Sequence, residues 1–96
     1  MSSVEFIKNT FGIDNETIMN MINICEGILI IDKDRILQNA KTLIEFGYPK
    51  NELGMLFSVN PAVLCYDYKE LTAKLKQVIK NNNNLEELLK NNPFLI

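Results

Sequence analysis

Four lysines in the second half of the sequence form the group best suited to binding chemistry. Lys69, Ala73, Lys76 and Lys80 are spaced at i, i+4, i+7 and i+11, and Lys74 flanks them. On a helix these positions make a nearly straight row, which could bind the phosphates of a nucleic acid or an acidic protein. Such a row is also typical of the solvated face of an exposed helix. The positions 35 residues earlier hold Asp34, Gln38, Lys41 and Glu45, so the basic row does not continue there.

The residue types argue against catalysis. The sequence contains no histidine and therefore lacks the most common general base and metal ligand. Asp32 and Asp34 come without the glycine and distal glutamate of a calcium loop, and no glycine-rich phosphate loop occurs. Most acidic residues stand at predicted helix starts, where the helix dipole explains them. We expect no enzymatic activity, no cofactor and no metal site.

The two cysteines and the apolar runs indicate the environment of the protein. Cys25 and Cys65 lie far apart in apolar surroundings, without a C-x-x-C pair, and we expect both to be reduced core thiols of a cytoplasmic protein. No apolar run is longer than five residues, so we expect neither a membrane span nor a signal peptide. The net charge is −2, with the acidic excess in residues 1–40 and a slight basic excess in residues 41–96.

The elements that must position these residues form a repeat. Phe11-Gly12 recurs as Phe46-Gly47, and Asp32 recurs as Asp67, each 35 residues later. A third copy starts with an offset of 32, which aligns Asn60-Pro61 with Asn92-Pro93. Apolar positions at helical spacing follow the same register. The pattern predicts one all-α helical-repeat domain over residues 1–96: a capping helix (1–12), repeat 1 (13–46), repeat 2 (47–81) and a partial repeat 3 (82–96).

Each unit is predicted to consist of a helix, a short helical turn and a second helix. Helix caps are expected at Ser2, Asp14, Asp32, Asp67 and Asn84. Gly27 is predicted to end the first helix of repeat 1 in a left-handed conformation, and Pro49 to occupy the first helical position of repeat 2. The apolar segment 27–32 could be a strand, but its counterpart 61–66 begins with proline, which favours a helical turn. Residues 81–84 are predicted to be a polar break.

These features resemble the mitochondrial transcription termination factor (mTERF) family of helical repeats. The resemblance covers about residues 11–96 and rests on a glycine–aromatic turn, leucine pairs and a proline followed by an apolar pair. In repeat 2 the matching residues are Phe46-Gly47-Tyr48, Leu53, Leu56-Phe57, Pro61, Val63-Leu64, Leu71, Leu75 and Ile79; in repeat 3 they are Leu85, Leu88-Leu89, Asn92-Pro93-Phe94 and Leu95-Ile96. The resemblance implies a curved solenoid whose groove binds nucleic acid.

Two functions remain open at this point. A non-catalytic protein-binding adaptor or inhibitor is favoured by the acidity, the small size and the lack of a continuous basic groove. The alternative is an mTERF-like nucleic-acid-binding protein that uses Lys69, Lys74, Lys76 and Lys80. The apolar residues Phe94, Leu95 and Ile96 either fold back on the preceding helix or mediate self-association as a homodimer.

Overall fold

The computed structural model describes residues 2–81 and 84–96 and consists of helices and loops. Six α-helices and four 3-10 turns follow one another, and no strand occurs in these residues. In chain order they are α1 (Ser3–Phe11), α2 (Asn15–Ile24), η1 (Glu26–Leu29), α3 (Lys33–Glu45), η2 (Lys50–Glu52), α4 (Leu53–Val59), η3 (Pro61–Leu64), α5 (Tyr68–Val78), α6 (Leu85–Asn91) and η4 (Pro93–Leu95). Two residues of the predicted polar break, 82 and 83, lie outside the described residues.

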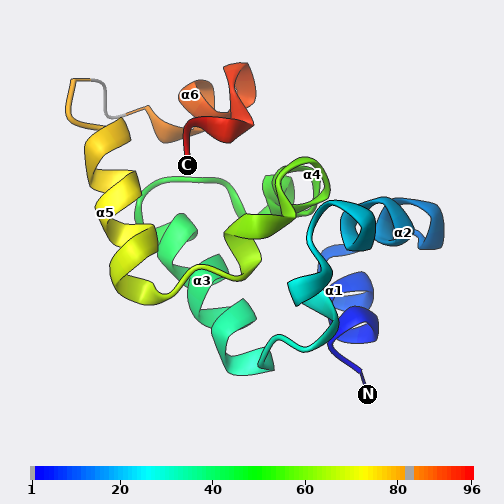
Figure 1. Cartoon of the computed structure of the whole chain (residues 1–96). Helices are drawn as coiled ribbons and strands as arrows, with labels where there is room; N and C mark the ends of the chain where they lie inside the picture. The colour runs from blue at the N-terminus through cyan, green and yellow to red at the C-terminus, as the bar shows by residue number, and fades with distance from the viewer. Residues whose placement is uncertain (1, 82–83) are drawn as a thin grey trace.

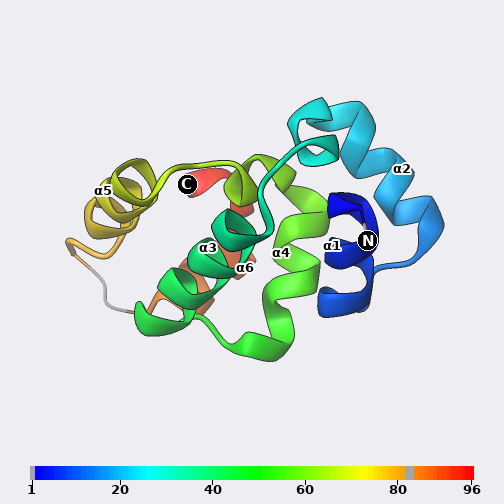
Figure 2. The ribbon, with the colours of Figure 1, turned by 90° about the horizontal axis from the view of Figure 1, so that it is seen from below.

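Equivalent elements of successive units pack on one another. Helix α2 contacts α4, α3 contacts α5, and the turn η1 contacts η3. The molecule is elongated, with principal extents of 39 × 24 × 20 Å. Figures 1 and 2 show α1 and α2 at one end, α3 and α4 in the middle and α5 at the other end. This stacking confirms the predicted all-α helical repeat, while the repeat boundaries at residues 13, 47 and 82 stay predictions.

The predicted side-chain caps are confirmed at all five helix starts. The Asp14 carboxylate accepts the backbone N–H of Thr17 at 2.8 Å, and the Asp67 carboxylate accepts that of Glu70 at 2.7 Å. Ser2, Asp32 and Asn84 cap their helices in the same way. Each cap satisfies one of the amide donors that a helix start leaves without a partner. The short polar side chains therefore fix where the helices begin.

Two glycines end helices at equivalent places in the repeat. Gly12 follows α1 with φ of 66°, and Gly47 follows α3 with φ of 103°. The next residue closes each turn: Ile13 donates its backbone N–H to Lys8 at 3.0 Å, and Tyr48 donates to Leu43 at 2.9 Å. Left-handed backbone of this kind favours glycine because it has no Cβ. The recurring Phe-Gly pair is thus a recurring helix stop.

Two local predictions are wrong. Helix α2 ends at Ile24, with Cys25 extended at φ −143°, and Gly27 lies inside the turn η1 rather than in left-handed backbone. Pro49 precedes η2 as an extended residue with ψ of 135°, so it is not the first helical residue. In both cases a 3-10 turn takes the place expected for a helix terminus. The helical turn expected near residue 27 is confirmed, and the strand is excluded.

One continuous core runs through the stack. Its fully buried side chains come from successive helices and turns and include Ile7, Met21, Ile36, Leu43, Phe57, Leu64 and Leu75. The rings of Phe11 and Phe57 meet edge to face, with their centroids 4.9 Å apart, and join α1 to α4. None of the described helices is long and apolar enough to cross a membrane.

Candidate nucleic-acid interface

Helix α5 turns its lysines away from the core. Leu71 and Leu75 are fully buried and fasten the helix to the stack. Lys69 and Lys76 are exposed on α5, and Lys80 is exposed just beyond its end. A rise of 1.5 Å per residue places Lys69 and Lys76 about 10 Å apart along the helix axis. The sequence row is therefore an exposed surface feature, which we call the α5 ridge (Lys69, Lys74, Lys76 and Lys80).

Lys74 differs from the other members of the α5 ridge. Its side chain is partly buried, and its Nζ lies 5.2 Å from the centroid of the Tyr66 ring. A cation at this distance is attracted by the π-face of the ring. The Tyr66 hydroxyl in turn donates to the backbone oxygen of Ile96 at 2.8 Å. Burial, together with the negative charge of Glu70, raises the pKa of Tyr66, so this hydroxyl remains a donor at neutral pH.

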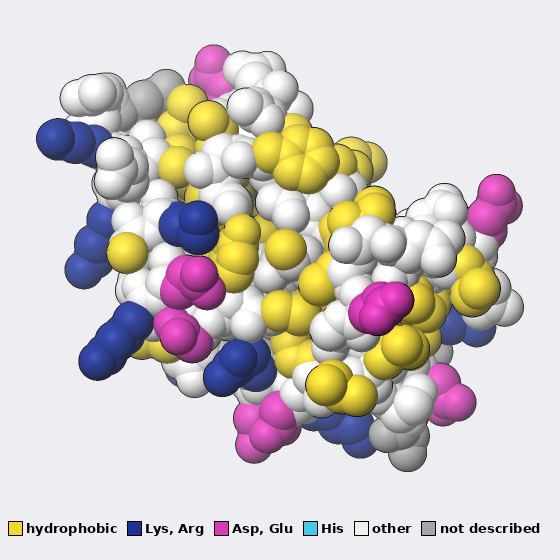
Figure 3. All heavy atoms as spheres, in the orientation of Figure 1, with side chains coloured by type: hydrophobic (Ala, Val, Ile, Leu, Met, Phe, Trp, Pro, Cys, Tyr) yellow, Lys and Arg dark blue, Asp and Glu magenta, His cyan; other side chains and the backbone are white. Residues whose placement is uncertain are grey.

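The lysines of the α5 ridge form no ion pair with any residue that the structure describes. Within residues 2–81 and 84–96, the ion pairs join Lys41 to Glu45 and Lys90 to Glu52 and Glu86. The hydrogen bond from Lys90 to Glu86 raises the pKa of Lys90, as expected for a paired cation. Figure 3 shows dark blue side chains along the left edge of the molecule, where α5 lies in Figure 1. These unpaired ammonium groups are available to an anionic ligand.

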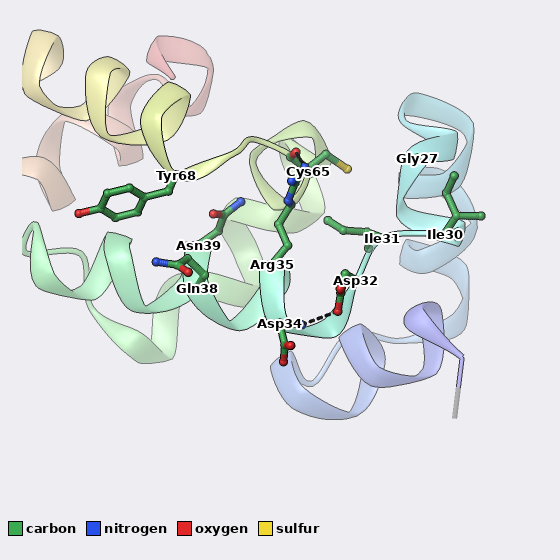
Figure 4. A pocket seen from close by; sticks show the side chains of 10 residues that line it. All are labelled: Gly27, Ile30, Ile31, Asp32, Asp34, Arg35, Gln38, Asn39, Cys65 and Tyr68. Atoms are coloured by element: carbon green, nitrogen blue, oxygen red, sulfur yellow. Dashed lines mark hydrogen bonds between the residues drawn. The ribbon is translucent and has the colours of Figure 1, made fainter.

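A surface depression of about 590 Å³ lies between α3 and the start of α5 (Figure 4). Arg35 and Gln38 line it from α3, and Tyr68, which is exposed, lines it from the start of α5. The Arg35 guanidinium donates to the backbone oxygen of Cys65 at 3.2 Å, which leaves its other N–H groups for a ligand. Asp32 and Asp34 also line the depression, so its charge is mixed.

A buried asparagine holds the two units together beside this depression. Asn39 of α3 has no exposed surface, and its Nδ2 lies 2.9, 3.1 and 2.7 Å from the backbone oxygens of Val63, Leu64 and Tyr66. Its Oδ1 is buried and has no hydrogen-bond partner among the residues that the structure describes. One amide group thus fastens α3 to η3 and to the segment that leads into α5. The last of these contacts, at Tyr66, lies just before α5, the helix that carries the α5 ridge.

The two cysteines lie at the edge of the core rather than inside it. Both side chains are free thiols and only partly buried, and their Sγ atoms are 3.9 Å apart. Burial, the nearby Cys25 and a sulfur hydrogen bond raise the pKa of Cys65 to about 11, against a smaller opposing effect of Arg35. Separate core positions were predicted, whereas the fold brings the two thiols together. Among the described residues no three potential metal ligands gather in one place.

The candidate self-association residues divide into two kinds. Ile96 is buried with 4% exposure, whereas Phe94 is 63% and Leu95 42% exposed. The Asn60 amide donates to the backbone oxygen of Pro93 at 3.1 Å and so holds the turn η4 against the end of α4. Ile96 therefore folds back on the core of its own chain. Phe94 and Leu95 remain at the surface.

The repeat architecture defines a helical-repeat protein, and a comparison with protein-family models identifies its family. The mTERF family model matches residues 1–95, and the chain belongs to this family. A search of curated proteins and a search of solved structures each found no significant match. The resemblance drawn from the sequence is thus confirmed over nearly the whole chain.

Sequence reasoning missed Asn39 and the depression next to it. The signal for Asn39 was present, because a polar residue three positions after Ile36 and one before Ala40 lies on the buried stripe of its helix. The depression had no comparable signal. Arg35 and Tyr68 line the same depression only because α3 and α5 pack side by side.

Proposed function

We propose that this protein binds nucleic acid and that the α5 ridge contacts the phosphate backbone. Membership of the mTERF family supports this proposal, because the sequence resemblance implies nucleic-acid binding. The observation that carries it is the set of α5 ridge lysines that lack an ion pair within the described residues. The proposed function requires no catalytic step.

Local charge favours the α5 ridge although the whole chain is acidic. Residues 68–80 contain four lysines and a single acidic residue, Glu70. Affinity for phosphates depends on the cations that reach them, each of which releases a condensed counterion. Most acidic side chains stand on other elements, such as Asp14 at the start of α2, while Asp67 caps α5 and Asp32 borders the depression next to it. A net charge of −2 is therefore compatible with one basic face.

The depression between α3 and α5 extends the proposed surface. Arg35 offers free guanidinium N–H groups, and Tyr68 offers an exposed ring at the start of the ridge helix. A phosphate can accept hydrogen bonds from the first, and an unstacked base can stack on the second. We propose these two residues as secondary contacts. The carboxylates of Asp32 and Asp34 make the depression itself a weaker anion site than the ridge.

The family match changes the balance between the two functions left open by the sequence. It favours the nucleic-acid-binding alternative over the protein-binding adaptor or inhibitor. The adaptor has in its favour the exposed side chains of Phe94 and Leu95, which a second protein could cover. It remains the competing hypothesis and predicts no salt-sensitive binding of nucleic acid.

A binding titration with charge-reversal variants tests the proposal. Fluorescence anisotropy with duplex DNA, single-stranded DNA and RNA should detect binding by the unaltered chain. The double variant Lys76→Glu with Lys80→Glu should lower the affinity at least tenfold. The matched control is Lys41→Glu with Lys50→Glu, which changes the net charge equally at exposed positions outside α5. Lys41 is also the counterpart of Lys76 in the 35-residue register. Equal weakening by both variants would contradict the assignment to the α5 ridge.

A further inference from the structure

Two cysteines from different repeats meet at the interface between them. Cys25 joins α2 to η1, and Cys65 directly follows η3, 40 residues later. Their Sγ atoms are 3.9 Å apart because η1 packs against η3. A disulfide bond has an S–S length of about 2.05 Å, so the sulfurs need to approach by a little under 2 Å. Rotation about two Cα–Cβ bonds can supply a movement of this size.

The surroundings leave the sulfurs room to move. A Cβ added at Gly27 would lie 3.5 Å from the Cys65 Sγ and 3.7 Å from the Cys25 Sγ, so the glycine backbone passes beside both. Because Gly27 carries no side chain, that space stays open. Figure 4 shows the Cys65 side chain directed toward the turn that carries Gly27. Both cysteines are partly exposed, and Cys65 borders the surface depression, which gives a dissolved oxidant access.

We propose that Cys25 and Cys65 form a reversible intramolecular disulfide, with a small-molecule disulfide such as oxidised glutathione as the oxidant. One thiolate attacks a sulfur of the oxidant, the S–S bond of the oxidant breaks, and a glutathione thiolate leaves. The second cysteine then attacks the resulting mixed disulfide and releases the other glutathione. The two protein thiols lose two electrons to the oxidant, and their two protons pass to the released thiolates.

The bond would lock two successive repeats together. It closes a loop of about 40 residues, which reduces the freedom of the unfolded chain and raises the thermal midpoint by several degrees. It also lies next to the contact between Arg35 and the Cys65 carbonyl. The raised pKa of Cys65 keeps that thiol protonated at neutral pH. Since thiolates are the reacting species, disulfide formation should accelerate as the pH rises toward 11.

Oxidation of the full chain with excess oxidised glutathione tests this proposal. We expect a product that has lost two hydrogen atoms and has no covalent link between chains, in which peptide mapping links the segments containing Cys25 and Cys65. Dithiothreitol should restore the original mass. Cys25→Ser and Cys65→Ser should each carry one glutathione at most, with a circular dichroism spectrum equal to that of the unaltered chain. A product with two separate glutathione adducts, or with links between chains, would overturn the proposal.

A redox titration separates this geometry from chance encounters of two thiols. We expect the equilibrium with glutathione to favour the internal disulfide at least tenfold more in the folded chain than in concentrated guanidinium chloride. The folded structure holds the sulfurs close, whereas the unfolded chain separates them. An equilibrium that is equal in both conditions, or less favourable in the folded chain, would refute the claim that the fold prepares this bond.

Discussion

Replacement of Asn39 by alanine tests the junction that orients α5. The side chain has no exposed surface, and its amide nitrogen donates to three backbone oxygens between Val63 and Tyr66. Asn39→Ala removes these donors and leaves the carbonyls of η3 without partners inside the stack. The Oδ1 atom has no hydrogen-bond partner among the described residues, so removing it leaves no donor unsatisfied.

The expected loss of stability follows from these contacts. Two N–H groups serve three carbonyls, and a buried polar group left unsatisfied costs about 1–3 kcal/mol. Alanine is a better helix former than asparagine, which offsets about 0.6 kcal/mol. Two lost N–H bonds at about 1.5 kcal/mol each, less the gain in helix propensity, should lower the free energy of unfolding by about 2.5 kcal/mol. For a domain of this length that lowers the thermal midpoint by roughly 10–20 °C.

Urea unfolding followed by far-UV circular dichroism measures this effect. The matched control is Gln38→Ala, an exposed neighbour on the same helix, which should change the unfolding free energy by less than about 0.5 kcal/mol. A loss below about 1 kcal/mol for Asn39→Ala would refute the reasoning. It would mean that the carbonyls of η3 find other partners and that α5 is held without Asn39.

Three further predictions concern stability and assembly. The pKa of Cys65 is raised from 9.0 to about 11, so the stability that its thiol contributes is complete below pH 9 and is lost as the pH rises to 11. Over that range the free energy of unfolding, measured with urea, should fall by about 1 kcal/mol more for the unaltered chain than for Cys65→Ala, because solvent screens a partly exposed thiol. Gly54→Ala should destabilise the chain by about 1–3 kcal/mol in the same assay, since its Cβ would lie 2.6 Å from the Phe11 backbone oxygen, and an unchanged midpoint would exclude that close approach. Phe94 and Leu95 are predicted to mediate self-association, so sedimentation velocity should show a dimer of the unaltered chain. The double variant Phe94→Asp with Leu95→Asp should be monomeric, and an unaltered chain that is monomeric at high micromolar concentration would refute the prediction.

The parts of the fold that depend on neighbouring residues were predictable from the sequence. Caps such as Asp14 and Asp67 act within three residues, and the Phe-Gly pairs stop their helices with their own backbone. The repeat register also contained the correct answer for Cys25, which aligns with Asn60. Both residues precede a 3-10 turn and have similar φ angles, −143° and −128°. Gly27 suggested a different helix end because glycine is the residue that favours a left-handed helix stop.

Features that depend on the stacking of the units were not predictable in the same way. Cys25 and Cys65 are 40 residues apart, and only the contact between η1 and η3 brings their sulfurs together. The burial of Ile96 likewise depends on how η4 lies against the preceding repeat, because Tyr66 and Asn60 hold that segment by its backbone oxygens. Spacing along the chain specifies faces of helices, but the packing of those faces sets the distances between them.

The salt dependence of duplex binding tests the proposed function most directly. Three exposed lysines of the α5 ridge, each neutralising one phosphate, give a slope of log affinity against log salt of about −2.7, which is an approximately 40-fold loss between about 50 and 200 mM salt. Lys76→Glu with Lys80→Glu should leave a slope of about −0.9, an approximately 3-fold loss. Lys41→Glu with Lys50→Glu should keep the slope of the unaltered chain. Equal slopes for all three proteins, or no salt-sensitive binding by the unaltered chain, would contradict nucleic-acid binding through α5.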